Sequence, residues 1–318
     1  MFLFIIKIVT VVLVFLTHVA VGVYAERKLM GHMQARLGPM RVGWHGVLQV
    51  IADGIKLFFK EDIIPANSDK PIFYMAPILG VLAAVGSIAV IPLWDNFSIA
   101  NLNVGILYIL ALSSVGAYSI ILAGWSSNSK YSFLGALRSS AQVISYEISM
   151  GLSLVGVMML AGSANLSDIV RAQSGLWFVV PQIIAFFVFV VSAIAETNRT
   201  PFDLPEAESE LVAGYFTEYS GMRWGLFMMA EYVGMIIMSS MAAVCFLGGW
   251  SGPEFWFFSY VPDVIWFILK VYAFMFFYIW LRATLPRYRY DQLMGLGWKL
   301  FIPLALANIV LTGLVKLL

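Results

Sequence analysis

The amino-acid sequence predicts an all-α fold: a polytopic integral membrane protein with about eight transmembrane helices and one amphipathic helix at the membrane surface. Of its 318 residues, 61% are hydrophobic and 12% are charged, which is about half the charged share of an average soluble domain. Apolar runs of about 20 residues, the length that crosses the hydrocarbon core of a bilayer, recur along the chain. Because no charged, Pro-rich or Ser-rich linker separates them, we predict one membrane domain over residues 1–318.

Eight segments meet this length criterion. The predicted spans are residues 2–25, 72–94, 102–125, 140–162, 176–196, 222–249, 262–283 and 296–317. The first run is apolar and ends near the small Ala25, as a secretory signal would. It is too long for a signal, contains Lys7 and precedes a basic segment, so we interpret it as a span.

Lysine and arginine are distributed unevenly between the two predicted sides of the membrane. Cytoplasmic loops retain these residues, and fifteen of the 19 fall in or beside the loops after the first, third, fifth and seventh spans. The other four are Lys7, Arg171, Lys270 and Lys316. This distribution predicts that both termini lie on the outer, periplasm-like side.

The chain offers few side chains that could hold a redox metal. It has one cysteine, Cys245, and three histidines, His18, His32 and His45, which are too few for an iron–sulfur cluster or a closed zinc site. The sequence also lacks nucleophile elbows, phosphate-binding loops, zinc-hydrolase signatures and GxGxxG fingerprints. We therefore expect no redox cofactor in this chain, so any electrons belong to a partner subunit.

The basic segment after the first span contains a predicted amphipathic helix, residues 44–62. Its polar residues Gln49, Asp53, Lys56 and Lys60 are spaced by four, three and four positions, which places them on one helical face. The remaining faces are apolar and carry Val47, Leu48, Ile51, Ile55, Phe58 and Phe59. The segment is therefore either a surface anchor or a helix whose polar stripe lines a cavity.

The loop after the fifth predicted span, about residues 196–221, is rich in carboxylates. Its acidic residues are Glu196, Asp203, Glu206, Glu208, Glu210 and Glu218. A capping box of Asp203 and Glu206, with Pro205 in the first turn, would explain two or three of them. It does not explain six, so a proton or cation path is the favoured interpretation.

Three ionisable residues are predicted to lie within spans: Glu147, Glu231 and Lys270. Ionisable groups at membrane depth cost several kcal/mol unless they are paired or hydrated, which makes each one a candidate functional residue. The alternatives are a structural ion pair, for instance between Glu231 and Lys270, or carboxyls that burial keeps neutral.

The segment after the seventh span mixes basic and aromatic residues. It contains Arg282, Arg287, Tyr288, Arg289, Tyr290 and Asp291. This composition suits a cytoplasmic anchor with an interfacial aromatic belt. The arginine and tyrosine donors would equally suit a quinone headgroup, and composition leaves both interpretations open.

Five segments together resemble a known family. They are AERKLMGHMQARLGP (25–39), ADGIKLFFKED (52–62), GWSSNSKYSFLGALRSSAQVISYE (124–147), AETNRTPFDLPEAESELVAGYFTEYS (195–220) and LRATLPRYRYDQLMGLGWK (281–299). They closely resemble the signature loops of a membrane subunit of proton-pumping NADH:quinone oxidoreductase, respiratory complex I. This subunit is called H in bacteria and subunit 1 in mitochondria. The family motif often has Gly where this chain has Ala207, a small departure.

The resemblance implies an eight-helix subunit at the heel of the L-shaped complex. There it would form much of the quinone chamber and couple quinone reduction to proton translocation through buried acidic groups. NADH, FMN and the iron–sulfur clusters would reside in partner subunits. The expected partners are the other subunits of the peripheral and membrane arms, quinone and membrane lipid, with no nucleic acid. The wording LPEAESELVAGY favours a multi-pass protein of the bacterial cell inner membrane over a mitochondrial one.

The resemblance also assigns residues, position by position. The quinone-chamber residues are Glu26, Arg27, Arg36, Asp53, Lys56, Lys60, Glu61, Arg282, Arg287, Arg289 and Asp291. The proton-path residues are Glu147, Glu196, Glu206, Glu208, Glu210 and Glu231.

Two other functions are weighed against this one. A homologous subunit of a membrane-bound hydrogenase or of a ferredoxin-linked relative would share the helices, but we would expect weaker agreement in the loops. A secondary transporter would use the acidic groups as a proton relay. Transporters commonly show internal repeats and paired broken helices, and the sequence shows no such repeat.

Overall fold

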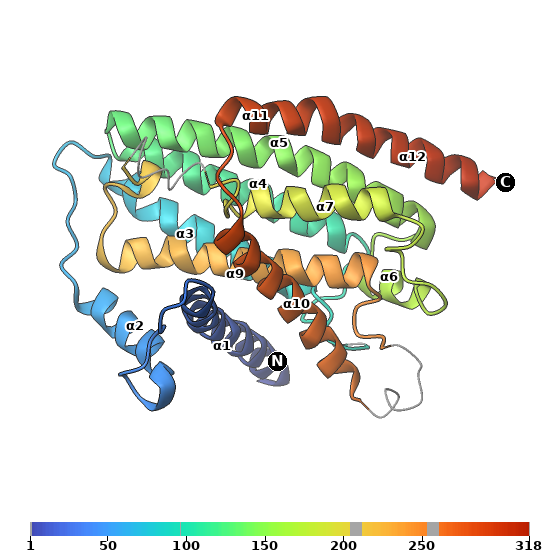
Figure 1. Ribbon diagram of the computed structural model, residues 1–318, viewed down its shortest axis with the longest axis horizontal. Helices are drawn as coiled ribbons and strands as arrows, with labels where there is room; N and C mark the ends of the chain where they lie inside the picture. Colours follow the sequence, from blue (N-terminus) through green and yellow to red (C-terminus); the bar gives the residue numbers. More distant parts are fainter. Residues whose placement is uncertain (1, 96, 204–211, 253–260, 318) are drawn as a thin grey trace.

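The computed structural model describes residues 2–95, 97–203, 212–252 and 261–317 (Figure 1). Within these ranges the regular elements are helical, and seven helices are long and apolar enough to cross a membrane. They are α1 (Phe2–Met33), α3 (Lys70–Ser87), α4 (Gly105–Ser126), α5 (Lys130–Ala161), α9 (Gly221–Phe246), α10 (Asp263–Thr284) and the composite helix Tyr290–Leu317. The predicted all-helical membrane fold is confirmed.

The remaining elements are short. The composite helix consists of α11 (Tyr290–Leu296), a π-helical turn (Gly297–Phe301) and α12 (Ile302–Leu317). The other short helices are α2 (Gln49–Phe59), α6 (Leu166–Ala172) and α7 (Ile183–Glu196). Single 3-10 turns occupy Trp44–Gly46, Ile88–Val90 and Gly214–Phe216.

The predicted fifth span, residues 176–196, is only partly helical. Its α-helix, α7, begins at Ile183 and has 14 residues, so it is about 21 Å long against the roughly 30 Å of a hydrocarbon core. Residues 178–182 precede it as turns. Pro181 lies in these turns, and proline has no N–H to donate to a continuous helix.

Several predicted boundaries shift for a common reason. Hydropathy detects only the apolar part of a helix, whereas polar turns can continue it beyond the membrane. Thus α1 extends to Met33 and α5 already begins at Lys130. In the amphipathic segment the α-helix is shorter than predicted, because Lys60 is extended (ψ 136°) and ends α2 after Phe59.

Helix α9 occupies the middle of the bundle and contacts α1, α3, α7 and α10 (Figure 1). Every residue from Met235 to Phe246 is buried, which is expected for a helix surrounded by others on all sides. By contrast α1 leaves Val9, Leu13 and Val21 exposed. These apolar side chains suit contact with lipid or with another membrane subunit.

Small residues allow the acidic loop to lie close against α5. A Cβ on Gly124 would be 2.2 Å from Cβ of Ala136, and a Cβ on Gly135 would be 2.6 Å from Cα of Gly214. Such small-residue contacts let membrane helices approach closely. Helices α4 and α5 therefore pack closely, and the 3-10 turn Gly214–Phe216 packs directly against α5.

Candidate functional site

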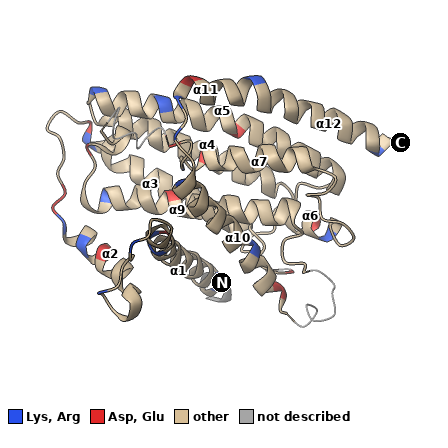
Figure 2. Ribbon diagram, viewed as in Figure 1, with Lys and Arg blue, Asp and Glu red and all other residues tan. Residues whose placement is uncertain are grey.

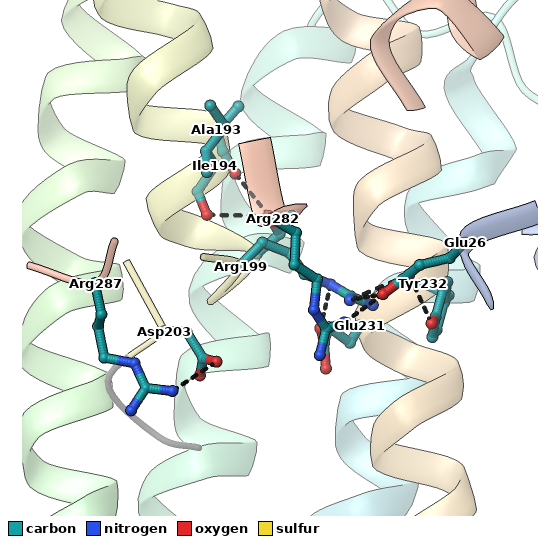
Figure 3. A network of polar contacts seen from close by, with 10 residues as sticks. Glu26, Ala193, Ile194, Arg199, Asp203, Glu231, Tyr232, Arg282 and Arg287 are labelled. Atoms are coloured by element: carbon teal, nitrogen blue, oxygen red, sulfur yellow. Dashed lines mark hydrogen bonds and ion pairs between the residues drawn. The ribbon is translucent and has the colours of Figure 1, made fainter. Parts of the chain in front are cut away.

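A buried ion cluster joins four separate parts of the chain (Figure 3). We call Glu26, Arg199, Glu231, Tyr232 and Arg282 the Arg199 cluster. Arg199 Nη1 donates to both carboxylate oxygens of Glu26, at 2.9 and 3.2 Å, and Arg282 Nη1 also donates to Glu26. Arg199 Nε pairs with Glu231, while the Tyr232 hydroxyl donates to Glu26 at 2.8 Å.

The cluster balances its charges in a place with little solvent. Glu26 and Arg199 expose only about 5% of their side chains, and two guanidinium groups face two carboxylates. Burial lowers the pKa of Arg199, but Glu231 and Glu26 outweigh it and hold the pKa above its ordinary value. Because buried charges are tolerated only when paired, each member depends on the others.

The end of α7 turns Arg199 back into the bundle. The Thr197 hydroxyl donates to the carbonyls of Ala193 and Ile194 at 3.0 and 3.1 Å. Asn198 then adopts a left-handed conformation (φ 51°), which asparagine tolerates better than most residues. This turn ends the helix and aims the next side chain at α1 and α9.

Two further carboxyls lie beside this cluster, each bound by a serine of α4. Ser113 donates to Glu196 at the end of α7, and Ser114 donates to Glu147 of α5. Ser113, Glu196 and Glu231 line one cavity of about 140 Å³. This volume is sufficient for several water molecules, so the cavity connects Glu231 of the Arg199 cluster with Glu196.

The polar stripe of α2 forms its own cluster around Asp53. Arg27 and Gln49 donate to the Asp53 carboxylate, and Lys56 lies 3.8 Å from it. Partial burial raises the pKa of Asp53, but the hydrogen bonds from Arg27 and Gln49 and the charges of Arg27 and Lys56 together outweigh this and lower the pKa below its ordinary value. Lys60, the fourth predicted member of the stripe, lies beyond the helix and is exposed.

The two arginines of the segment 287–291 have different surroundings. Arg287 Nη2 donates to the buried carboxylate of Asp203 at 3.3 Å, apart from the Arg199 cluster (Figure 3). Arg289 pairs with Asp291 at 3.5 Å, and both side chains are mostly exposed. Such exposed pairs contribute little to stability.

The other predicted site residues are at the surface or outside the described ranges. Arg36 and Glu61 are exposed. Glu206, Glu208 and Glu210 lie outside the described residues. Lys and Arg gather where α2 lies and α3 and α5 begin (Figure 2), which agrees with the predicted basic side.

The suggested ion pair between Glu231 and Lys270 is wrong. Glu231 pairs with Arg199. Lys270 Nζ instead donates to the carbonyls of Leu247, Gly249 and Ser251 at 2.6, 2.8 and 2.6 Å. These carbonyls follow the C-terminal end of α9, where the helix dipole favours a cation.

Sequence reasoning missed four residues of the site: Arg199, Tyr232, Ser113 and Ser114. Arg199 is one of the fifteen basic residues that indicate topology, and its place beside the loop carboxylates is the signal that could have marked it as their partner. The two serines lie in a Ser-rich and Gly-rich span, and nothing in the sequence distinguishes them. Among the described residues, no group of three or more His, Cys, Asp or Glu could hold a metal ion.

Comparison with known proteins identifies the family. A family model described as NADH dehydrogenase matches residues 6–313. An H subunit of NADH-quinone oxidoreductase from Geobacter metallireducens, the one numbered 2, is 52% identical, covering 98% of this chain and 94% of the relative. The H subunit of the same enzyme from Rhodospirillum centenum is 54% identical over 96% of this chain and 92% of the relative. The chain therefore belongs to the NADH dehydrogenase family, with the H subunits of bacterial NADH-quinone oxidoreductases, the membrane subunits of complex I.

Proposed function

We propose that this chain forms the membrane part of a quinone chamber in an NADH:quinone oxidoreductase and couples quinone reduction to proton translocation. The assembly would supply NADH oxidation, FMN and iron–sulfur clusters in other subunits, while quinone enters as the substrate. The names and near-complete coverage of the relatives support the assembly.

One observation carries the coupling role: the Arg199 cluster links two sets of residues that the family resemblance assigns to different tasks. Glu26 and Arg282 belong to the chamber set, and Glu231 belongs to the acidic path. Arg199 contacts both Glu26 and Glu231. A change of charge on the chamber side would therefore alter the cost of ionising Glu231, because buried charges interact strongly at short range.

The path would continue from Glu231 through water in the cavity to Glu196 and then to Glu147. Glu231 and Glu196 line the same cavity, and Glu147 is held by the serine next to the one that holds Glu196. Glu147 and Glu196 interact electrostatically, and interacting carboxyls titrate as a coupled set. Protons could then shift along the row without any redox centre in this chain.

The surface supports a role inside a larger assembly. The apolar side chains Ile51, Ile55, Phe58 and Phe59 of α2 are exposed, so this helix suits the membrane surface or a partner subunit. The exposed Arg36 lies on the basic side, where we propose that the peripheral arm docks. The bacterial relatives support a place in the bacterial cell inner membrane, with lipid around the apolar helices.

Glutamine variants of Glu147 and Glu231 test the proposed coupling, because glutamine keeps size and hydrogen bonding but cannot titrate. In the assembled complex in native membrane vesicles, we expect each variant to lose most quinone reductase activity and proton pumping. NADH oxidation by an artificial hydrophilic acceptor should stay normal and report assembly. Asp263→Asn, at an exposed carboxyl outside both residue sets, is the control. If both variants pumped at the control rate and proton-to-electron ratio, the proposed path would be abandoned.

A further inference from the structure

Two adjacent serines of α4 donate hydrogen bonds to carboxyls on two different helices. Ser113 donates to Glu196 of α7, and its neighbour Ser114 donates to Glu147 of α5. Consecutive residues of an α-helix point about 100° apart, so a Ser–Ser pair can reach both neighbouring helices from one level. The pair thus fixes two carboxyls of the proposed path relative to each other.

Ser114 has a second acceptor within reach. Its Oγ lies 3.2 Å from the carbonyl oxygen of Leu110, one turn earlier in α4. A hydroxyl has one hydrogen to donate and two lone pairs with which to accept. Ser114 can therefore donate either to Glu147 or to Leu110, and in the second case its oxygen is free to accept a hydrogen bond from Glu147.

We propose that Ser113 and Ser114 are positioning residues of the proton path, and that Ser114 adjusts its hydroxyl to the charge of Glu147. When Glu147 is ionised, Ser114 donates to it. When Glu147 takes a proton from the path, its O–H donates to Ser114 Oγ and the serine hydrogen turns to Leu110. No bond of the serine breaks, and the proton added to Glu147 is the one that a neighbouring carboxyl or water of the path loses. This inference rests on the proposed function.

The surroundings of Glu147 and Glu196 suit carboxyls that change between the ionised and the protonated state. Oε2 of Glu196 is buried and has no hydrogen-bond partner among the described residues, while the adjoining cavity has room for water. The titratable groups around the two carboxyls are each other, Glu231 and Tyr215 on the cavity wall, and Tyr278 of α10, which interacts electrostatically with Glu196. The fixed cation nearby, Arg199, is occupied by Glu26 and Glu231.

A purely structural role is the competing interpretation. Serines in helices often bond to the carbonyl four residues earlier without any further task. In that case the contact with Leu110 would be sufficient, and the orientation toward Glu147 would carry no consequence for turnover. The two roles differ in what happens to the pH dependence when the hydroxyl is removed.

Substitution of Ser114 separates these roles in the complete complex. For Ser114→Ala we expect the pH profile of quinone reductase activity to move to higher pH by about one unit. The substitution removes a hydrogen bond worth about 1.5–3 kcal/mol when Glu147 is ionised, but only about 0.5–1.5 kcal/mol when Glu147 is protonated. The hydroxyl therefore favours the ionised form by a difference of about 1–1.5 kcal/mol, and 1.36 kcal/mol is one unit. Ser114→Thr keeps the hydroxyl and should keep the wild-type profile. Ser114→Cys keeps the volume with a weaker donor and should shift the profile in the same direction as Ser114→Ala.

The matched controls are Ser149→Ala in α5 and Ser192→Ala in α7. Both hydroxyls are buried and have no hydrogen-bond partner among the described residues, so their loss should leave the profile unchanged. If Ser114→Ala and Ser114→Cys showed the control profile while Glu147→Gln abolished pumping, the positioning role would be overturned and the proposed function would stand. If Glu147→Gln pumped normally, the proposed function itself would fail. Should Ser114→Ala not assemble, the Cys and Thr variants decide the question in the same way.

Discussion

Arg199 and Glu26 form a buried ion pair across 173 positions of the sequence, with Arg199 Nη1 2.9 Å from Oε1 and 3.2 Å from Oε2 of Glu26. The contact fixes the end of α7 against α1. Because Arg199 also pairs with Glu231, the same guanidinium fixes α9. The Arg199 cluster is therefore both a structural junction and the proposed link between chamber and path.

Removal of the Arg199 guanidinium should destabilise the subunit strongly. Arg199→Met would leave Glu26 and Glu231 with one fewer cation in a buried site, and breaking such a pair costs about 3–5 kcal/mol, a large part of a typical stability of about 5–15 kcal/mol. We expect little assembled complex on native gels. Arg199→Lys should rescue only partly, since an ammonium cannot reproduce the planar fork that serves two carboxylates. The exposed Arg289→Met is the control, and equal assembly of Arg199→Met and this control would contradict the prediction.

The sequence predicts the membrane spans well because lipid imposes a simple rule on them. Apolar length alone locates α4, α9 and α10 to within three residues. For α3 the predicted span ends seven residues too late, because a 3-10 turn and an extended segment follow Ser87. The rule fails at residues 176–196, where turns replace the first part of a span. There the interior of the bundle satisfies polar groups that lipid could not: Gln182 donates to Thr312 at 2.7 Å and accepts from Asn308 at 2.6 Å.

The candidate site is less predictable, because its contacts join distant positions. The sequence marks Glu26, Glu147 and Glu231 as unusual, but it does not reveal which cation meets which carboxylate. Glu231 illustrates the difficulty. The sequence places both Glu231 and Lys270 inside predicted spans, yet the ion-pair partner of Glu231 is Arg199 in a loop. Only the fold brings the loop after α7 back to α9.

Lys270 should support structure rather than proton transfer. Its amine donates to three backbone carbonyls beyond the end of α9, and each buried acceptor left without a donor costs about 1–3 kcal/mol. Lys270→Met should therefore lower the thermal stability of the complex while any assembled enzyme keeps its proton-to-electron ratio. Lys316→Met, which removes an exposed lysine at the end of α12, should have little effect. A lowered ratio in stable Lys270→Met enzyme would show that this lysine belongs to the proton path.

Because α7 is short, a measurement of membrane topology tests whether the segment 176–196 crosses the membrane. Between Ser127 and Ser251 the chain contains α5, the segment 176–196 and α9. If the segment crosses the membrane with its leading turns, the two serines lie on opposite sides. If it does not, they lie on the same side. From the distribution of basic residues, we expect a reporter fused after Ser127 to be cytoplasmic and one fused after Ser251 to be external, and the same location for both would refute eight crossings.

Arg287 should support quinone reduction more than Arg289 does. Arg287 donates to Asp203, a carboxylate of the acidic loop 196–221 that is about 95% buried. Arg289, by contrast, faces solvent beside Asp291. A guanidinium is always charged and geometrically fixed, so it can orient this segment beside the proposed chamber. Arg287→Met should lower quinone reductase activity at least severalfold and leave NADH oxidation by a hydrophilic acceptor intact, while Arg289→Met should lower quinone reductase activity less. Equal loss of both activities in Arg287→Met would indicate failed assembly instead, and a wild-type rate of quinone reduction would remove Arg287 from the proposed site.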